Sequence, residues 1–244
     1  MIIKRITDKL LAGNWRSFVL ELFLIVLGVL IALQVDNWNE ARKETALMHE
    51  YLARMVLDLQ RDITEFERIS EAAEVRLAAG LRIRELLLGA KPTNDDYTEM
   101  LRMLRRAGFT ARPRISDYTF ETLKSSGNLN LITDPDLRDA ILSYYGYLEG
   151  RKQYNYIIED NQLNYQKGLD EVMTMQQRDR FFARESEEVN VEEGAELLMR
   201  AIASEDYQRS LPGSIINNRN FLGDSQRGRE RAVELIQLIK PANQ

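Results

Sequence analysis

The sequence predicts an all-α protein whose N-terminal transmembrane helix continues into a long helix of an extracytoplasmic helical bundle. The first observation is an apolar stretch, 18–35, in which Leu22–Leu33 carries no polar side chain. The second is that apolar residues after this stretch recur at helical spacing. The third is the scarcity of helix breakers, because the 244 residues include only 5 prolines and 13 glycines, and β-branched runs are short.

The composition is that of a globular protein with one domain beyond the N-terminal stretch. Hydrophobic residues make up 44% of the chain and charged residues 29%, a balance that favours a packed core over disorder. The net charge is −5 and basic residues are spread among acids, so nucleic acid is not an expected partner. The sequence contains no cysteine, which excludes disulfides, thiol catalysis and Cys-ligated zinc. We expect no cofactor.

Residues 18–38 are predicted to form a transmembrane anchor. The apolar run of about 18 residues is at the lower end of the lengths that span a hydrocarbon core. Trp15 and Trp38 flank it. On a continuous helix rising about 1.5 Å per residue they would lie about 34 Å apart, one at each interface. The predicted division is a cytoplasmic basic tail at 1–17, the anchor at 18–38 and a periplasmic helical domain at 39–244.

The orientation follows from the charges on either side of the apolar run. Four basic residues and one acid precede it, namely Lys4, Arg5, Lys9, Arg16 and Asp8. Basic excess belongs on the cytoplasmic side, which predicts a single-pass protein of the bacterial inner membrane with its C-terminal domain in the periplasm. The alternative is a cleaved signal peptide, but Leu30-Ile31-Ala32 has a large residue where an A-x-A-like cleavage site needs a small one.

Six residues of this segment are candidates for contact with another transmembrane helix: Glu21, Gly28, Ala32, Gln34, Trp38 and Asn39. An ionisable group such as Glu21 at membrane depth suggests pairing with a polar group or a place in a pore; the alternatives are that it reaches the inner headgroups or is protonated. Gly28 and Ala32 form a small-xxx-small pair. Gln34 and Asn39 can hydrogen-bond between helices, although interfacial hydration is the simpler explanation. Together they predict a homo-oligomer around the N-terminal helix.

The stretch GVLIALQVDNWNEARKE follows a pattern that joins Glu21, an apolar run and the residues Gly28, Leu30, Ile31, Ala32, Leu33, Gln34, Asn37, Trp38, Asn39 and Glu40. This pattern resembles the hallmark of a large, uncharacterised family of bacterial single-span membrane proteins, with Asp36 in place of the usual Asn. A second similarity covers Tyr118–Gly127 and Tyr144-Tyr145. The resemblance implies an anchored extracytoplasmic helical domain and brings no known activity.

The helix that contains the anchor is predicted to continue to Leu88-Gly89. Its apolar residues repeat at alternating steps of four and three, as Leu52, Val56, Leu59, Ile63 and Phe66. Such a stripe is typical of one face of a bundle core, or of a self-associating coil. Asp58 and Asp62 fall between these positions, close to basic residues, and are predicted to lie among the polar residues of the helix.

Further helices are predicted from caps and apolar spacing. Their approximate ranges are 94–107, 117–125, 136–173, 191–211 and a last helix ending at Lys240, with Pro212-Gly213 as a turn before the last helix. The stretch 128–132 is predicted to be extended or irregular, and the charged stretch 176–193 to be a solvated loop or the start of a helix. A calcium site in that stretch lacks the expected ligand spacing.

No catalytic motif is present. His49 is the only histidine. It has no E-x-x-H context for a ferritin-like di-iron site, and the chain has no G-x-S-x-G elbow. Five tyrosines, Tyr144, Tyr145, Tyr147, Tyr154 and Tyr156, either fill the core or line a ligand pocket.

The functional expectation is therefore an interaction protein and not an enzyme. It is a membrane-anchored periplasmic helical module that binds the lipid bilayer and a protein partner, either copies of itself or a larger membrane complex. The alternative is a periplasmic ligand-binding domain of sensor type that works with a separate transducer. An apolar pocket with convergent polar groups would favour the alternative.

Overall fold

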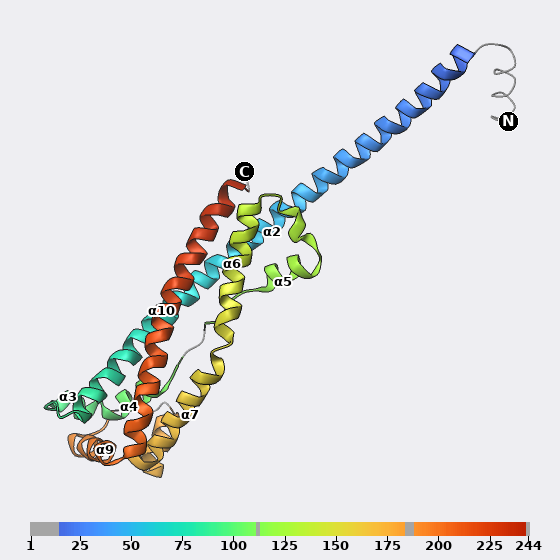
Figure 1. The fold of residues 1–244 in the computed structure, drawn as a ribbon. Coiled ribbons are helices and arrows are strands. Elements are labelled where there is room, and N and C mark those ends of the chain that lie inside the picture. The colour runs from blue at the N-terminus through green and yellow to red at the C-terminus, as the bar shows by residue number, and fades with distance from the viewer. Residues whose placement is uncertain (1–14, 111–112, 184–187, 243–244) are drawn as a thin grey trace. The chain divides into compact units, whose positions relative to one another are not determined.

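The computed structural model describes residues 15–110, 113–183 and 188–242, and over these ranges it contains helices and no strands (Figure 1). The elements are α2 (Trp15–Leu87), α3 (Asn94–Thr98), α4 (Met100–Gly108), α5 (Tyr118–Ser125), the 3₁₀ helix η1 (Asn128–Leu131), α6 (Pro135–Lys152), α7 (Asn155–Val172), α8 (Met175–Ala183), α9 (Val191–Ala203) and α10 (Glu205–Ala242). The predicted fold class is confirmed: the apolar N-terminal helix continues into a helical region. Most of the predicted basic tail, residues 1–14, lies outside the described residues.

The chain forms two compact units, residues 1–51 and 52–244, and α2 belongs to both. In the first unit α2 contains a window that is long and apolar enough to cross a membrane, and no residue of this window is buried. The second unit is a helical bundle in which α10 packs most extensively on α7 and also on α6 and α4.

The buried face of α2 in the second unit follows a heptad that differs from the predicted one. Leu52, Leu59 and Phe66 are buried, as predicted. Between them the buried positions are Met55 and Asp62, each one residue before the predicted Val56 and Ile63, which are half-buried; Ile69 continues the buried stripe after Phe66. The steps therefore run three then four from Leu52, and Asp62 occupies a core position of the repeat. The prediction that Asp58 and Asp62 are ordinary polar-face residues was wrong, because both are buried.

A second part of the core closes the end of the bundle where α2 stops. It joins Ile83 and Leu86 of α2 to residues of α4, α7, α9 and α10, including Leu104, Leu169, Leu197 and Leu211. Two buried tyrosines bond to each other at its centre, with 3.1 Å between the Tyr165 and Tyr207 hydroxyls, and Tyr165 donates to the carbonyl of Leu104 at 2.8 Å. The hydroxyls are thus satisfied within an apolar cluster.

The predicted turn at Pro212-Gly213 is absent, because α10 runs through it without a break. The chain instead turns at Ser204, whose hydroxyl oxygen accepts a hydrogen bond from the backbone N–H of Tyr207 at 3.0 Å and so caps α10. Gly213 allows close packing of two helices: a Cβ there would lie 2.7 Å from the Asn161 side chain of α7. Proline inside a helix costs about 3 kcal/mol, and the packing of α10 offsets that cost.

Other boundaries differ locally from the prediction. The helix expected over 94–107 is interrupted at Glu99, and the one expected over 136–173 breaks after Lys152. The stretch 176–193, expected to be a solvated loop or the start of a helix, contains most of α8, in which Gln177 and Phe181 are buried. A reciprocal pair of bonds starts α8: Gln177 N–H donates to Thr174 Oγ1, and Thr174 N–H donates to Gln177 Oε1. This is a capping box, which marks the start of a helix. The sequence prediction overlooked it because it relied on the high charge of the stretch.

Candidate functional site: a cavity and an acid row in the helical unit

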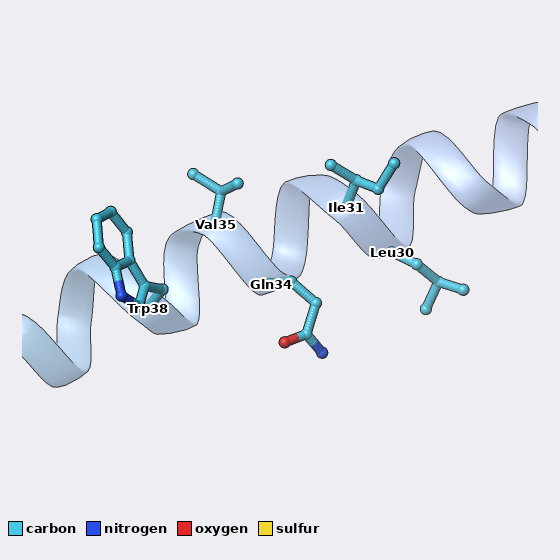
Figure 2. Close-up of a pocket in the computed structure, with 5 residues that line it drawn as sticks. All are labelled: Leu30, Ile31, Gln34, Val35 and Trp38. Carbon is cyan, nitrogen blue, oxygen red and sulfur yellow. The ribbon is translucent and has the colours of Figure 1, made fainter.

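The six residues predicted as a membrane-segment site all lie on α2 and are exposed. With about 100° between successive residues, Glu21, Gly28, Ala32 and Asn39 share one face of the helix. Gln34 lies on a different face, with Trp38 beside it. Gln34 and Trp38 line a shallow hollow of about 300 Å³ together with Leu30, Ile31 and Val35, and Figure 2 shows these five side chains on α2. The structure therefore divides the predicted site between two faces.

A cavity of about 930 Å³ lies in the helical unit. Its walls come from α2, the irregular segment 113–117, α5, α6, the start of α7 and α10. Apolar side chains from these elements and from η1 line it: Phe66, Phe120, Leu129, Leu142, Ile158 and Phe221. The volume falls in the range of about 300–1,000 Å³ that is typical of small-molecule sites.

Two aromatic rings form one wall of this cavity. The rings of Phe120 and Tyr145 stack with centroids 4.1 Å apart and planes 7° apart. Burial raises the pKa of the Tyr145 hydroxyl above its ordinary value, so the group stays neutral. Of the five tyrosines noted in the sequence, Tyr145 and Tyr147 line the cavity, Tyr144 is buried, and Tyr154 and Tyr156 are exposed.

The charged residues of the cavity are concentrated at its mouth. The side chains of Lys124, Glu121, Lys152, Asp117 and Glu149 are each between 51% and 69% exposed, which places them at the rim and not on the floor. They pair with one another: Lys124 lies 3.4 Å from Glu121, and Lys152 lies 2.8 Å from Glu149 and 3.6 Å from Asp117. The cavity is thus an apolar interior under a rim of paired charges.

One wall is held in place by a row of acids on α2. The Glu65 carboxylate accepts the backbone N–H of Arg114 at 2.9 Å, and Asp62 accepts that of Ser116 at 2.8 Å. Asp58 accepts the hydroxyl of Thr119. We call Asp58, Asp62 and Glu65 the acid row. Segment 113–117 has no helix to satisfy its backbone donors, so carboxylates on α2 take that role.

Asp62 is the most perturbed of these acids. Burial raises its pKa from 3.8 to about 6, against the hydrogen bonds from Ser116 N–H and from the Tyr144 hydroxyl, which is 2.9 Å away. The neighbouring charges of Asp58 and Asp117 raise it further. Burial, together with the charge of the same carboxylate, raises the pKa of Tyr144, which therefore remains a proton donor in this bond.

Sequence reasoning missed the acid row and most of the cavity. A signal for Asp62 was present, because the heptad 52, 55, 59, 62, 66 puts an acid at a core position. No comparable signal identifies the cavity, since Phe66, Ile158 and Phe221 lie far apart in the sequence and meet only in the folded bundle. Among the described residues no three His, Cys, Asp or Glu side chains gather as a metal-binding group.

The comparisons with known proteins identify a family. A family model described as "Family of unknown function (DUF6090)" matches residues 21–196. The chain belongs to the DUF6090 family. The DUF6090 match includes all six predicted membrane-segment residues, the acid row and the cavity walls as far as α7, but not the α10 wall with Phe221. No curated protein and no solved structure matches the chain. The resemblance seen in the sequence is confirmed as membership of an uncharacterised family.

Proposed function

We propose that this DUF6090 protein is a membrane-anchored binding module whose helical unit binds an apolar small molecule in the bundle cavity. In this proposal residues 18–38 cross the bacterial inner membrane, the N-terminus is cytoplasmic and the helical unit is periplasmic. The observation that carries it is the cavity of about 930 Å³ with an apolar interior. Clefts of this size and lining are the usual sites of small ligands, and a core that needed no ligand would close them to gain packing.

The absence of a catalytic constellation from the cavity lining supports binding over chemistry. The side chains of the interior are mostly apolar or aromatic, and the less exposed Arg151 and Asp224 form an ion pair. At the rim, Lys124 pairs with Glu121 and Lys152 pairs with Glu149. This arrangement fits the ligand-binding alternative that the sequence left open, with a separate partner needed to transmit any signal. The topology is tested by fusing a reporter that is active only in the periplasm after Gln244. Activity supports the orientation, and activity of a cytoplasmic reporter alone contradicts it.

Binding is tested with a photoreactive hydrocarbon that carries a diazirine and no headgroup, applied to the full chain in lipid nanodiscs. Peptide mass spectrometry then locates the labels. Labelling of 18–38 reports contact with lipid and serves as the internal control. Labelling of the peptides that contain Phe120, Leu142 or Phe221 supports the proposal, whereas labels confined to 18–38 contradict it.

Gly146 provides a variant that fills the cavity. It lines the cavity, and a Cβ added to it meets no atom within 4 Å, so Gly146→Trp is accommodated by the helix while taking up free space. Gly150 is four residues further along α6, is equally open and does not line the cavity, which makes Gly150→Trp the matched control. We expect the first substitution to reduce cavity labelling severalfold and the second to leave it unchanged.

Self-association through α2 is a second candidate function. The observation in its favour is the face that presents Glu21, Gly28, Ala32 and Asn39 together, which combines small residues with two polar ones. Crosslinking in membranes at native expression levels tests it. Glu21→Gln is expected to alter the yield of crosslinked oligomer or its pH dependence. Gln34→Leu, on another face, is the control; a chain that stays monomeric contradicts the candidate.

A further inference from the structure

The charges at the cavity mouth restrict the ligand that the cavity can hold. Three cations, Arg114, Lys124 and Lys152, and three carboxylates, Asp117, Glu121 and Glu149, line the mouth and have exposed side chains. Three positive and three negative charges leave no net charge. A headgroup of either single sign would therefore meet as much repulsion as attraction, and would compete with ion pairs that already exist.

The deeper charged pair follows the same rule. Arg151 and Asp224, which line the cavity and are less exposed than the rim residues, form an ion pair with each other. Asp224 also pairs with Arg227, which does not line the cavity, so a ligand group of either sign placed here would compete with existing ion pairs. Apolar side chains such as Phe66 and Phe120, which are buried, make up the interior lining. The ligand must therefore present an apolar body to the interior. The end at the mouth must be polar and carry either no charge or one charge of each sign.

We infer that the cavity takes a single-chain amphiphile whose headgroup has no net charge, such as a zwitterionic lysolipid. This inference rests on the proposed function and names the ligand class of the same cavity. One chain fits, because about 930 Å³ is at the upper end of the range for small ligands, and a two-chain phospholipid exceeds a small ligand in size.

A zwitterionic headgroup also matches the rim residue by residue. Lys124 and Lys152 can donate to a phosphate, while Glu121 and Glu149 can accept from an ammonium. A zwitterion brings one phosphate and one ammonium, so it can open one rim pair and pair with both of its members, which leaves no charge uncompensated. Because the rim pairs are exposed, each contributes little stability. The headgroup thus replaces one weak surface pair with two new pairs.

The test uses three photoreactive probes that share one palmitoyl-length chain and differ in the headgroup. They are a lysophosphatidylethanolamine, a fatty acid and an alkyl trimethylammonium, each with a diazirine in the chain. Each is added to the full chain in nanodiscs at pH 7.5, and labels are mapped as above. We expect the zwitterionic probe to label the cavity peptides at least threefold more than either ionic probe, after normalisation to the label on 18–38.

Two controls keep the test independent of folding. Excess unlabelled zwitterionic amphiphile is expected to remove the cavity label from the unmodified protein without changing the label on 18–38. Gly146→Trp is expected to lower the cavity label, and Gly150→Trp to leave it unchanged, with equal far-UV circular dichroism in both. Equal labelling of the cavity by all three probes overturns the charge argument.

The outcomes also separate this inference from the proposed function. If the headless hydrocarbon labels the cavity peptides and no headed probe does, the cavity binds apolar molecules but not single-chain amphiphiles, and only the inference fails. If neither kind of probe labels these peptides, both the inference and the proposed function fail.

Discussion

Replacing Asp62 by Asn tests the reasoning about the acid row most directly. Asn has nearly the same shape as Asp, its Oδ1 can accept the Ser116 N–H, and its Nδ2 can donate to the Tyr144 hydroxyl. The substitution therefore removes the negative charge and keeps both contacts. It mimics the protonated form of Asp62 at every pH.

The expected magnitude follows from the pKa of Asp62. A rise from 3.8 in the unfolded chain to about 6 in the folded protein means that folding favours the protonated acid. At about 1.36 kcal/mol per pH unit, the ionised carboxylate lowers the free energy of unfolding by about 3 kcal/mol above pH 6. This penalty is absent below pH 4, where the acid is protonated in both states, and it grows between the two values. Asp62→Asn should thus be up to about 3 kcal/mol more stable than the parent at pH 7.5 and similar to it at pH 3.5.

Urea unfolding monitored by far-UV circular dichroism, on the full chain in nanodiscs between pH 3.5 and 8, measures this difference. Other carboxylates titrate in both proteins, so only the difference between variant and parent isolates Asp62. The control is Asp62→Leu, which leaves the Ser116 N–H and the Tyr144 hydroxyl without partners and should cost about 1–3 kcal/mol for each. A variant–parent difference that does not change between pH 4 and 6 would refute the assignment of the perturbed titration to Asp62.

Two further predictions concern packing and an ion pair. Gly228→Ala should destabilise the bundle by about 1–3 kcal/mol, because its Cβ would lie 2.5 Å from the Phe66 ring. Gly223→Ala on the same helix would meet only the flexible end of the Arg227 side chain, at 3.4 Å, and should stabilise the bundle by about 0.5–1 kcal/mol. Urea midpoints for the two variants check this, and equal midpoints would contradict the close approach. The Arg82 guanidinium holds the pKa of Asp96 well below its usual range through bonds of 2.7 and 2.8 Å. The stability from this pair is fully present above the unfolded pKa of 3.8 and is lost as the pH falls below it through the folded pKa. Arg82→Met should therefore be less stable than the parent throughout pH 3.5–8, and should approach the parent only when the urea series is extended to lower pH.

Much of the fold could be predicted because local signals agreed with the global structure. The apolar run in α2, the Thr93 cap of α3 and the positive φ of Gly127 after α5 all act through neighbouring residues. Errors arose where tertiary packing overrode a local rule. Pro212 remains inside α10 because Gly213 lets that helix pack against α7, and no local pattern reports the proximity of α7.

The candidate site was less predictable for a related reason. The choice between two stripes on α2 depends on which face the other helices cover, and both stripes share Leu52, Leu59 and Phe66. Hydrophobicity alone favours Val56 and Ile63 over a stripe that includes an acid, so the pattern led to the wrong face. The partners that make Asp62 acceptable in the core, Ser116 and Tyr144, lie 54 and 82 residues away along the chain.

The acid row explains why a costly residue is retained beside the cavity. An apolar residue in place of Asp62 would suit the heptad. It would, however, leave the Ser116 N–H of segment 113–117 without an acceptor, because the backbone groups inside α2 already bond to one another. The carboxylates instead fix the segment at Arg114 and Ser116, and fix the start of α5 at Thr119. Apolar contacts are non-directional and would allow this wall to close on the cavity. Directional hydrogen bonds to α2 fix the position of this wall, and so maintain the cavity. They require a buried carboxylate at position 62, and the unfavourable burial of its charge is what raises the pKa of Asp62.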